Sequence, residues 1–195
     1  MPSLQIEQTL RFDFPHDWQA IKYDDTAFHL NYLNPIQEIK AVDIAAVPQS
    51  PGHLLFIEVK DYRMKAETGG RCGSYDYLAR AVARKALSTV AGLYLSSRIG
   101  DVALAPFAGR LLKAPQKLEV VLFMQELSLP PSRHYNYQKI LLDVRQKLIG
   151  LLDNLGITAR LYSLGALPPP GPWTVTDLYT PPAIPLAAIP SPKKK

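Results

Sequence analysis

The stretch that decides the fold is residues 53–62, HLLFIEVKDY. Its β-branched and aromatic residues predict a strand, because such side chains favour extended backbone. Side chains alternate between the two faces of a strand, so Leu55, Ile57 and Val59 share one face, and all three are apolar. The other face changes from apolar to charged at Glu58 and Lys60. These two charges are costly to bury alone, so compensating groups are expected beside them.

The segment before this strand contains a matching charge. Residues 36–47, IQEIKAVDIAAV, predict a second strand, which Pro48 ends. Asp43 is the only charged residue from position 41 to position 47. If the two strands form a hairpin through a loop at 48–52, Asp43 and Glu58 come close together. Two carboxylates at such a distance repel each other unless a cation lies between them.

The types of ligand predict which cation this is. Carboxylate oxygens with an open position favour Mg²⁺ or Mn²⁺ over zinc, and the backbone carbonyl of Val59 offers a further oxygen. Such a metal lowers the pKa of a bound water and neutralises charge on a phosphodiester. Lys60 would then orient or activate the attacking water and stabilise the transition state. We therefore predict catalytic roles for Asp43, Glu58 and Lys60.

Two short segments resemble the signature of a known superfamily. Val42-Asp43-Ile44 and Glu58-Val59-Lys60, separated by a turn, look like the Asp and Glu-x-Lys elements of the PD-(D/E)XK nucleases. The predicted order strand, strand, strand, helix, strand over about residues 27–125 also resembles their common core. The resemblance implies a Mg²⁺-dependent endonuclease that hydrolyses phosphodiester bonds, usually of DNA. It assigns metal binding to Asp43 and Glu58, and the role of the catalytic lysine to Lys60.

The resemblance also implies a fold and leaves one site residue open. The implied fold is a restriction-endonuclease-like α/β/α sandwich, in which helices flank a mixed central β-sheet. Val42 stands where the proline that names the motif would be. Members of the superfamily often carry a further acidic residue upstream, and four candidates remain open here: Glu7, Asp17, Asp24 and Asp25.

Periodicity predicts the remaining elements. The pattern alternates between strand and helix along the chain, which is typical of an α/β protein. The expected elements are a short strand or extended arm at 4–14, a short helix at 16–24, a strand at 27–33, an alanine-rich helix from Tyr75 to about Ser97, a buried strand at 117–125, an amphipathic helix at 136–155 and a strand at 157–163.

One domain and a tail are expected. Residues 1–167 are long enough to bury a core of their own and are expected to form the nuclease-like domain. Residues 168–195 contain nine prolines, which rules out a continuous helix or central strand. We expect this tail to be partly disordered, while its first residues, around Trp173, pack on the body.

Charge is distributed unevenly along the chain. Residues 1–59 carry eight acidic and three basic side chains, whereas residues 60–195 carry nine acidic and nineteen basic ones. This pattern suits a cation and a polyanion bound side by side, although a solvated surface with uneven charge is the alternative. The candidate nucleic-acid-binding residues are Arg63, Lys65, Arg71 and Lys85. For Lys85, which lies on an apolar helix face, a snorkelling side chain is the alternative.

The sequence also narrows the compartment and the classes of function. Its single cysteine excludes an internal disulfide and a CxxC zinc site, and its longest apolar run is too short for a membrane span. A cytoplasmic protein is expected. Motifs for nucleotide-binding loops, dinucleotides, serine hydrolases and zincins are absent from the sequence.

Three hypotheses remain. The first is a nuclease, with DNA favoured over RNA as its substrate, that works with a partner protein or as a homo-oligomer in a defence or genome-maintenance complex. The second is a catalytically inactive module on the same fold that binds protein or nucleic acid, since folds often keep an interaction role after losing their chemistry. The third is a structural α/β protein in which Glu58 and Lys60 simply pair.

Overall fold

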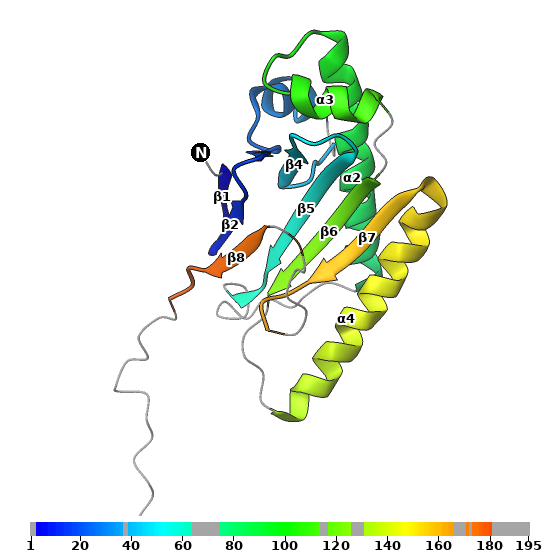
Figure 1. Ribbon diagram of the computed structural model, residues 1–195. Coiled ribbons are helices and arrows are strands. Elements are labelled where there is room, and N and C mark those ends of the chain that lie inside the picture. The colour runs from blue at the N-terminus through cyan, green and yellow to red at the C-terminus, as the bar shows by residue number, and fades with distance from the viewer. Residues whose placement is uncertain are drawn as a thin grey trace, which may run out of the picture.

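The strand predicted at 53–62 lies at the centre of the main sheet, as β5 (His53–Asp61). The computed structural model of the chain has a mixed α/β architecture with a five-stranded and a three-stranded sheet (Figure 1). It describes residues 3–36, 39–63, 75–113, 117–125, 131–165, 171 and 173–180.

The five-stranded sheet combines an antiparallel and a parallel half in the order β3-β4-β5-β6-β7. β3, β4 and β5 form an antiparallel meander, whereas β5, β6 and β7 run parallel. Strands in a parallel half are buried on both faces, which explains the unbroken apolar run in β6. The other strands of this sheet are β3 (Trp18–Lys22), β4 (Ile44–Pro48), β6 (Lys117–Gln125) and β7 (Ile157–Tyr162).

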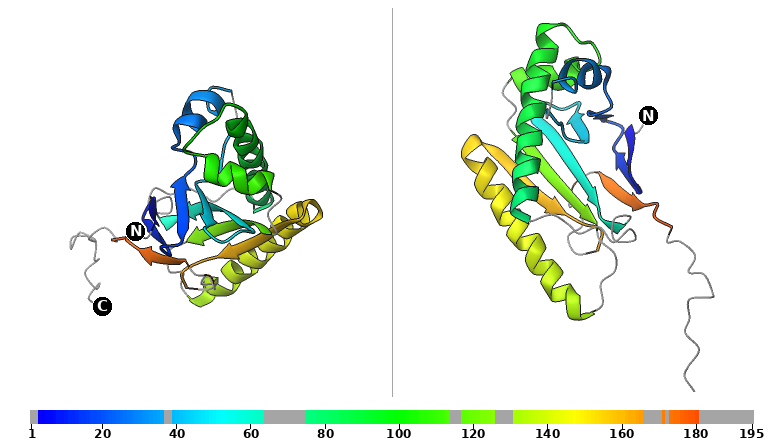
Figure 2. Two further views of the ribbon diagram at one scale, coloured as in Figure 1. Left: turned by 45° about the horizontal axis from the view of Figure 1, so that its top comes forward. Right: turned by 180° about the vertical axis from the view of Figure 1, so that it is seen from behind.

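Helices cover one face of this sheet, as the view from behind shows (Figure 2). α2 and α3 connect β5 to β6, and α4 connects β6 to β7, so that each crossover returns over the same face. Leu54 and Phe56 of β5 pack there with Leu78 and Val82 of α2 in the larger core. The helices are α2 (Tyr75–Arg98), α3 (Ala105–Leu112) and α4 (Pro131–Leu152), the last followed by the 3-10 helix η2 (Asp153–Leu155).

A small sheet covers the opposite face, where the α/β/α expectation had placed helices. The α/β sandwich is confirmed, but one of its outer layers consists of strands. β1 (Ser3–Glu7), β2 (Leu10–Phe14) and β8 (Thr174–Asp177) form this sheet in the order β1-β2-β8. An aromatic core with Phe12 and Trp173 lies between the two sheets and buries Ile57 of β5. Both faces of β5 are therefore core, and the second layer over the main sheet consists of strands.

Two predictions for the N-terminal part are wrong. The helix predicted at 16–24 is the strand β3, whose side chains alternate in burial and which pairs with β4. The strand predicted at 27–33 is replaced by the π-helix η1 (His29–Leu33). Its buried residues, His29 and Leu33, are spaced by four, as on one face of a helix. The seven residues 27–33 are too few to distinguish the two-residue period of a strand from the 3.6-residue period of a helix.

The later elements agree better with the predictions. The strands at 117–125 and 157–163 and the two long helices are confirmed. Gly156, at φ 69°, closes the last helix in the left-handed conformation that favours glycine. The second strand begins only at Ile44, and α3 was not predicted.

The start of the predicted tail belongs to the fold. Trp173 is 4% exposed, and β8 pairs antiparallel with β2. Residues 64–74 and residues 181–195, which include most of the predicted tail, lie outside the described residues. In the part of the chain that the structure describes, every helix is too short or too polar to cross a membrane.

Candidate functional site

Neighbouring strands bring the two predicted carboxylates together. Ile44 of β4 pairs with Ile57 of β5, and the same register, continued by one residue, sets Asp43 opposite Glu58. Residues directly opposite each other in an antiparallel pair have their side chains on the same face. For Asp43 and Glu58 this is the face that α2 covers, where Lys85 of that helix meets them.

Asp43 is held by the strand beside it. Its Oδ2 accepts a hydrogen bond from the backbone N–H of Val59 at 2.6 Å, and its Oδ1 lies 3.5 Å from Lys85 Nζ. Thr89 fastens the same segment to α2, because its hydroxyl accepts from the N–H of Val42 at 3.1 Å and donates to the carbonyl of Lys85 at 2.9 Å. One oxygen of Asp43 is thus used structurally and the other faces the site.

Glu58 is the most buried charge of the cluster. Its side chain is 1% exposed, and Lys85 Nζ donates to both carboxylate oxygens at 2.8 Å. Lys60 Nζ also pairs with Glu58 Oε1 and lies 3.3 Å from the carbonyl oxygen of Val59. Burial, and then the charge of Asp43, raise the pKa of Glu58 against the effect of the two lysines. Burial alone would lower the pKa of Lys85, but the carboxylates of Glu58 and Asp43 outweigh it and raise that pKa.

Among the upstream acidic candidates, Asp24 is electrostatically coupled to the cluster. Burial, followed by the charge of Asp43, raises the pKa of Asp24 to about 6. Its Oδ1 is buried and has no hydrogen-bond partner among the described residues. Such a carboxylate oxygen, buried without a hydrogen-bond partner, is costly.

The other three candidates are engaged or lie elsewhere. Glu7 and Asp25 both pair with Lys22, at 3.0 and 2.9 Å. Asp17 precedes β3 at the end where Trp18 pairs with Pro48, which is the end of β4 away from Asp43.

His29, which the sequence does not single out, is electrostatically coupled to Lys85 of this cluster. His29 lies in η1 and is 5% exposed, and burial together with the charge of Lys85 lowers its pKa. Its Nδ1 is buried without a hydrogen-bond partner in the described part of the chain. Only a helical reading of residues 28–33 would have placed His29 on a buried face.

The four basic residues predicted to bind nucleic acid differ in where they lie. Lys85 lies in the cluster, whereas Lys65 and Arg71 lie outside the described residues. The side chain of Arg63 is 5% exposed, and its guanidinium donates to both oxygens of Asp61 and, at 2.6 Å, to Asp177. Arg63 thus fastens β8 to the end of β5, and its guanidinium is not at an exposed surface.

The donor set fits a small divalent ion. Among the described residues, no three or more His, Cys, Asp or Glu side chains gather as a metal site. Asp43 and Glu58 supply two carboxylates, and the carbonyl of Val59 lies next to Glu58 in the chain and contacts the same lysine, Lys60. Mg²⁺ typically uses one or two protein carboxylates and keeps several waters. Three carboxylate oxygens already converge on one cationic atom, Lys85 Nζ.

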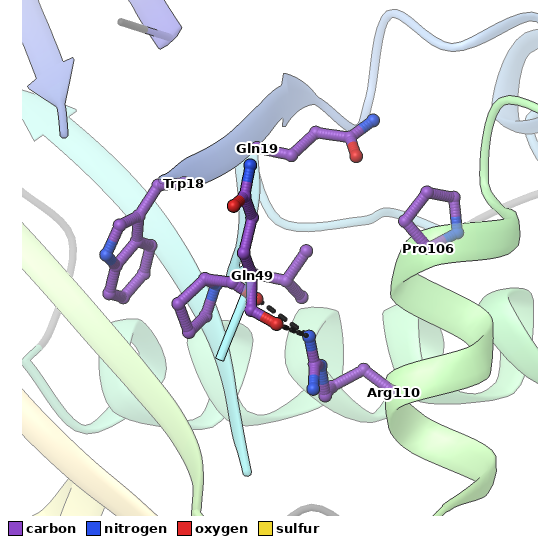
Figure 3. A pocket seen from close by; sticks show the side chains of 7 residues that line it. Trp18, Gln19, Gln49, Pro106 and Arg110 are labelled. Atoms are coloured by element: carbon purple, nitrogen blue, oxygen red, sulfur yellow. Dashed lines mark hydrogen bonds between the residues drawn. The ribbon is translucent and has the colours of Figure 1, made fainter. Parts of the chain in front are cut away.

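A separate pocket of about 250 Å³ lies at the other end of β4 (Figure 3). Arg110 of α3 donates there to the carbonyls of Pro48 and Gln49 at 2.7 and 3.4 Å. The lining includes none of the cluster residues: Trp18, Gln19, Val47, Pro48, Gln49, Pro106 and Arg110. This pocket is therefore not part of the candidate site.

Comparison with models of protein families, with curated proteins and with solved structures found no match to this chain. The functional interpretation therefore depends on the geometry of the cluster and on the short sequence resemblance.

Proposed function

We propose that this chain is a metal-dependent endonuclease that hydrolyses phosphodiester bonds of nucleic acid, with DNA favoured over RNA. The observation that supports this proposal is the convergence of Asp43, Glu58 and Lys60 on one face of two neighbouring strands. These three residue types in this arrangement are what the resemblance to the PD-(D/E)XK nucleases implies. Mg²⁺ or Mn²⁺ is the proposed cofactor.

Each residue has a distinct task in this proposal. Asp43, Glu58 and the carbonyl of Val59 would hold the metal, which when bound supplies a Lewis acid and a water of lowered pKa. Lys60, whose side chain is 27% exposed, remains close enough to Glu58 to hold a water beside the carboxylates. Its ammonium also stabilises the negative charge that develops on the phosphate.

The charges around the cluster support nucleic acid as the substrate class. Lys60 and Lys85 are both partly exposed, and Arg84 is exposed on the same helix as Lys85. Cations beside a carboxylate pair attract a phosphate backbone, whose affinity for proteins is largely electrostatic. Sequence preference would come from a partner protein or from a second copy of the chain.

A catalytically inactive module on the same fold is the second candidate. The observation that favours it is the contact of two ammonium groups with Glu58, which leaves the carboxylates of Asp43 and Glu58 balanced by Lys60 and Lys85 without a metal. Such a cluster could be retained for its structure alone.

A cleavage assay separates the two candidates. Plasmid DNA, single-stranded DNA and RNA are incubated with the protein in Mg²⁺ or Mn²⁺, and in EDTA. We expect metal-dependent cleavage that Asp43→Asn and Lys60→Ala each reduce by about 100-fold or more. The matched control is Asp143→Asn, an exposed carboxylate on α4, which should keep wild-type activity. If the folded wild-type protein cleaves none of these substrates, the nuclease proposal is contradicted and the inactive module is favoured.

A further inference from the structure

The ammonium of Lys85 lies where the cluster would hold a metal ion. Its Nζ is 2.8 Å from each carboxylate oxygen of Glu58 and 3.5 Å from Asp43 Oδ1. Glu58 belongs to β5, Asp43 directly precedes β4 and Lys85 belongs to α2, so three separate segments of the fold meet at this one atom. The oxygens that a divalent ion would need are thus already in use.

Lys85 can leave these oxygens without any movement of α2. The backbone of α2 is fixed there, because Thr89 bonds both the carbonyl of Lys85 and the N–H of Val42. The ammonium, by contrast, sits at the end of a flexible four-carbon stem. The side chain is 19% exposed, so a path to solvent is open to it.

The ammonium of Lys85 and a divalent ion would compete for the same carboxylate oxygens. The two carboxylates of Asp43 and Glu58 are balanced by the ammonium groups of Lys60 and Lys85. A divalent ion on the same oxygens would lie within a few ångströms of Lys85 Nζ, and like charges at that spacing repel strongly. The repulsion is relieved if Lys85 turns outward, toward the exposed surface that carries Arg84.

We propose that Lys85 is an internal counter-ion that competes with the divalent metal for Glu58 and Asp43 and, once displaced, pairs with a phosphate of the nucleic acid. This inference rests on the proposed function for the identity of the metal and of the anion. A phosphate that draws Lys85 outward frees the carboxylates, so nucleic acid and metal each raise the affinity of the protein for the other. By linkage, the two factors are equal.

Calorimetric titration of Mn²⁺ tests the competition without any measurement of activity. The variants are Lys85→Gln, which removes the competing charge, and Arg84→Gln, which removes a neighbouring exposed charge from the same helix. We expect Lys85→Gln to bind Mn²⁺ about tenfold or more tightly than the wild type, because the metal no longer displaces a cation. Arg84→Gln should stay within about twofold of the wild type, since exposed charges are screened.

Thermal unfolding is a second test, which remains informative if Lys85→Gln is less stable than the wild type. Without metal, Lys85→Gln leaves Glu58 with one lysine, so its Tm should be lower than that of the wild type. Mn²⁺ should then raise the Tm of Lys85→Gln more than it raises the Tm of the wild type. A short phosphorothioate oligodeoxynucleotide should increase the Mn²⁺ affinity of the wild type and leave that of Lys85→Gln unchanged.

The contrary outcomes are distinguishable. Equal Mn²⁺ affinities of the wild type and Lys85→Gln would overturn the competition and leave the proposed nuclease function standing. An oligonucleotide effect of the same size in both proteins would overturn the role of Lys85 in coupling. Absence of Mn²⁺ binding by both proteins, each folded by circular dichroism, would overturn the metal site and with it both proposals.

Discussion

Glu58 has almost no exposed surface, and two lysine ammonium groups contact its carboxylate. A buried charge is tolerated only when its partners compensate for its lost hydration. Removal of one partner leaves the remaining charge buried in a low dielectric without compensation. The four charged side chains of Asp43, Glu58, Lys60 and Lys85 therefore stabilise one another. A substitution at any of them is therefore expected to change stability, whatever its effect on the proposed activity.

Asp24 supports a pH-dependent prediction. Burial and Asp43 raise its pKa from 3.8 to about 6. Between these values the folded protein holds a proton that the unfolded chain has lost, so the free energy of unfolding falls as pH rises through this range. Asp24→Asn removes this loss and should raise the free energy of unfolding at pH 7 by about 1–2 kcal/mol, with little effect at pH 4. Urea unfolding at both pH values measures the difference, and equal destabilisation at both would contradict it.

Part of the cluster could be predicted residue by residue from the sequence. Alternation along two strands predicted that Asp43 and Glu58 share a face, and the helical stripe of α2 placed Lys85 toward the core. Asp24 and His29 could not be singled out in the same way. Both belong to segments that are too short to show a helix or strand period, and their positions depend on how β3 and η1 pack.

Among the elements, α2 has an unusually close contact with the N-terminal part of the chain. A Cβ added to Gly92 would approach Leu33 Cδ1 to 2.8 Å and would come still closer to the hydroxyl of Tyr23. Tyr23 is fully buried, and burial raises the pKa of its hydroxyl. The glycine is therefore required by the approach of α2 to η1 and to the end of β3.

Gly92→Ala should consequently destabilise the protein. The added methyl group must displace a buried ring, which costs about 1–3 kcal/mol of the free energy of unfolding. Gly150→Ala is the matched control, because Gly150 also lies in a helix and a Cβ there meets nothing within 4 Å. It should be neutral or stabilising by about 0.5–1 kcal/mol. Urea unfolding of both variants compares them, and a stabilised Gly92→Ala would contradict the packing.

Prediction of the elements succeeded where the pattern was long. The 24 residues of α2 and the nine-residue strands β5 and β6 offer several turns or alternations from which a period can be read. β3 and η1 have five residues each, and their sequences satisfy both periods. Their structure is decided by tertiary contacts, namely the pairing of β3 with β4 and the burial of η1 beneath α2.

For the whole molecule, the C-terminal strand joins segments that are far apart in the sequence. β8 extends the β1-β2 hairpin over the main sheet, where Trp173 packs against Phe12. Arg63 links Asp177 at the end of β8 to Asp61 at the end of β5, and Tyr179 lies against its guanidinium. This clamp holds the small sheet in place beside the strand that carries Glu58 and Lys60.

Arg63→Ala should therefore be costly. It leaves the buried carboxylate of Asp61 without its cation, and loss of one member of a buried pair costs about 3–5 kcal/mol. Arg80→Ala removes an exposed helical pair with Asp76 and should have no measurable effect. Chemical denaturation of the two variants gives the comparison. Wild-type stability of Arg63→Ala would show that the clamp does not hold the two sheets together.

The most direct test of the proposed metal site is anomalous diffraction from crystals of the wild-type protein grown with Mn²⁺. We predict one manganese peak bounded by the carboxylates of Asp43 and Glu58 and the carbonyl of Val59, with the ammonium of Lys85 withdrawn from both carboxylates. Absence of a peak at saturating Mn²⁺, with Lys85 still in contact with Glu58, would contradict the metal site and the nuclease function built on it.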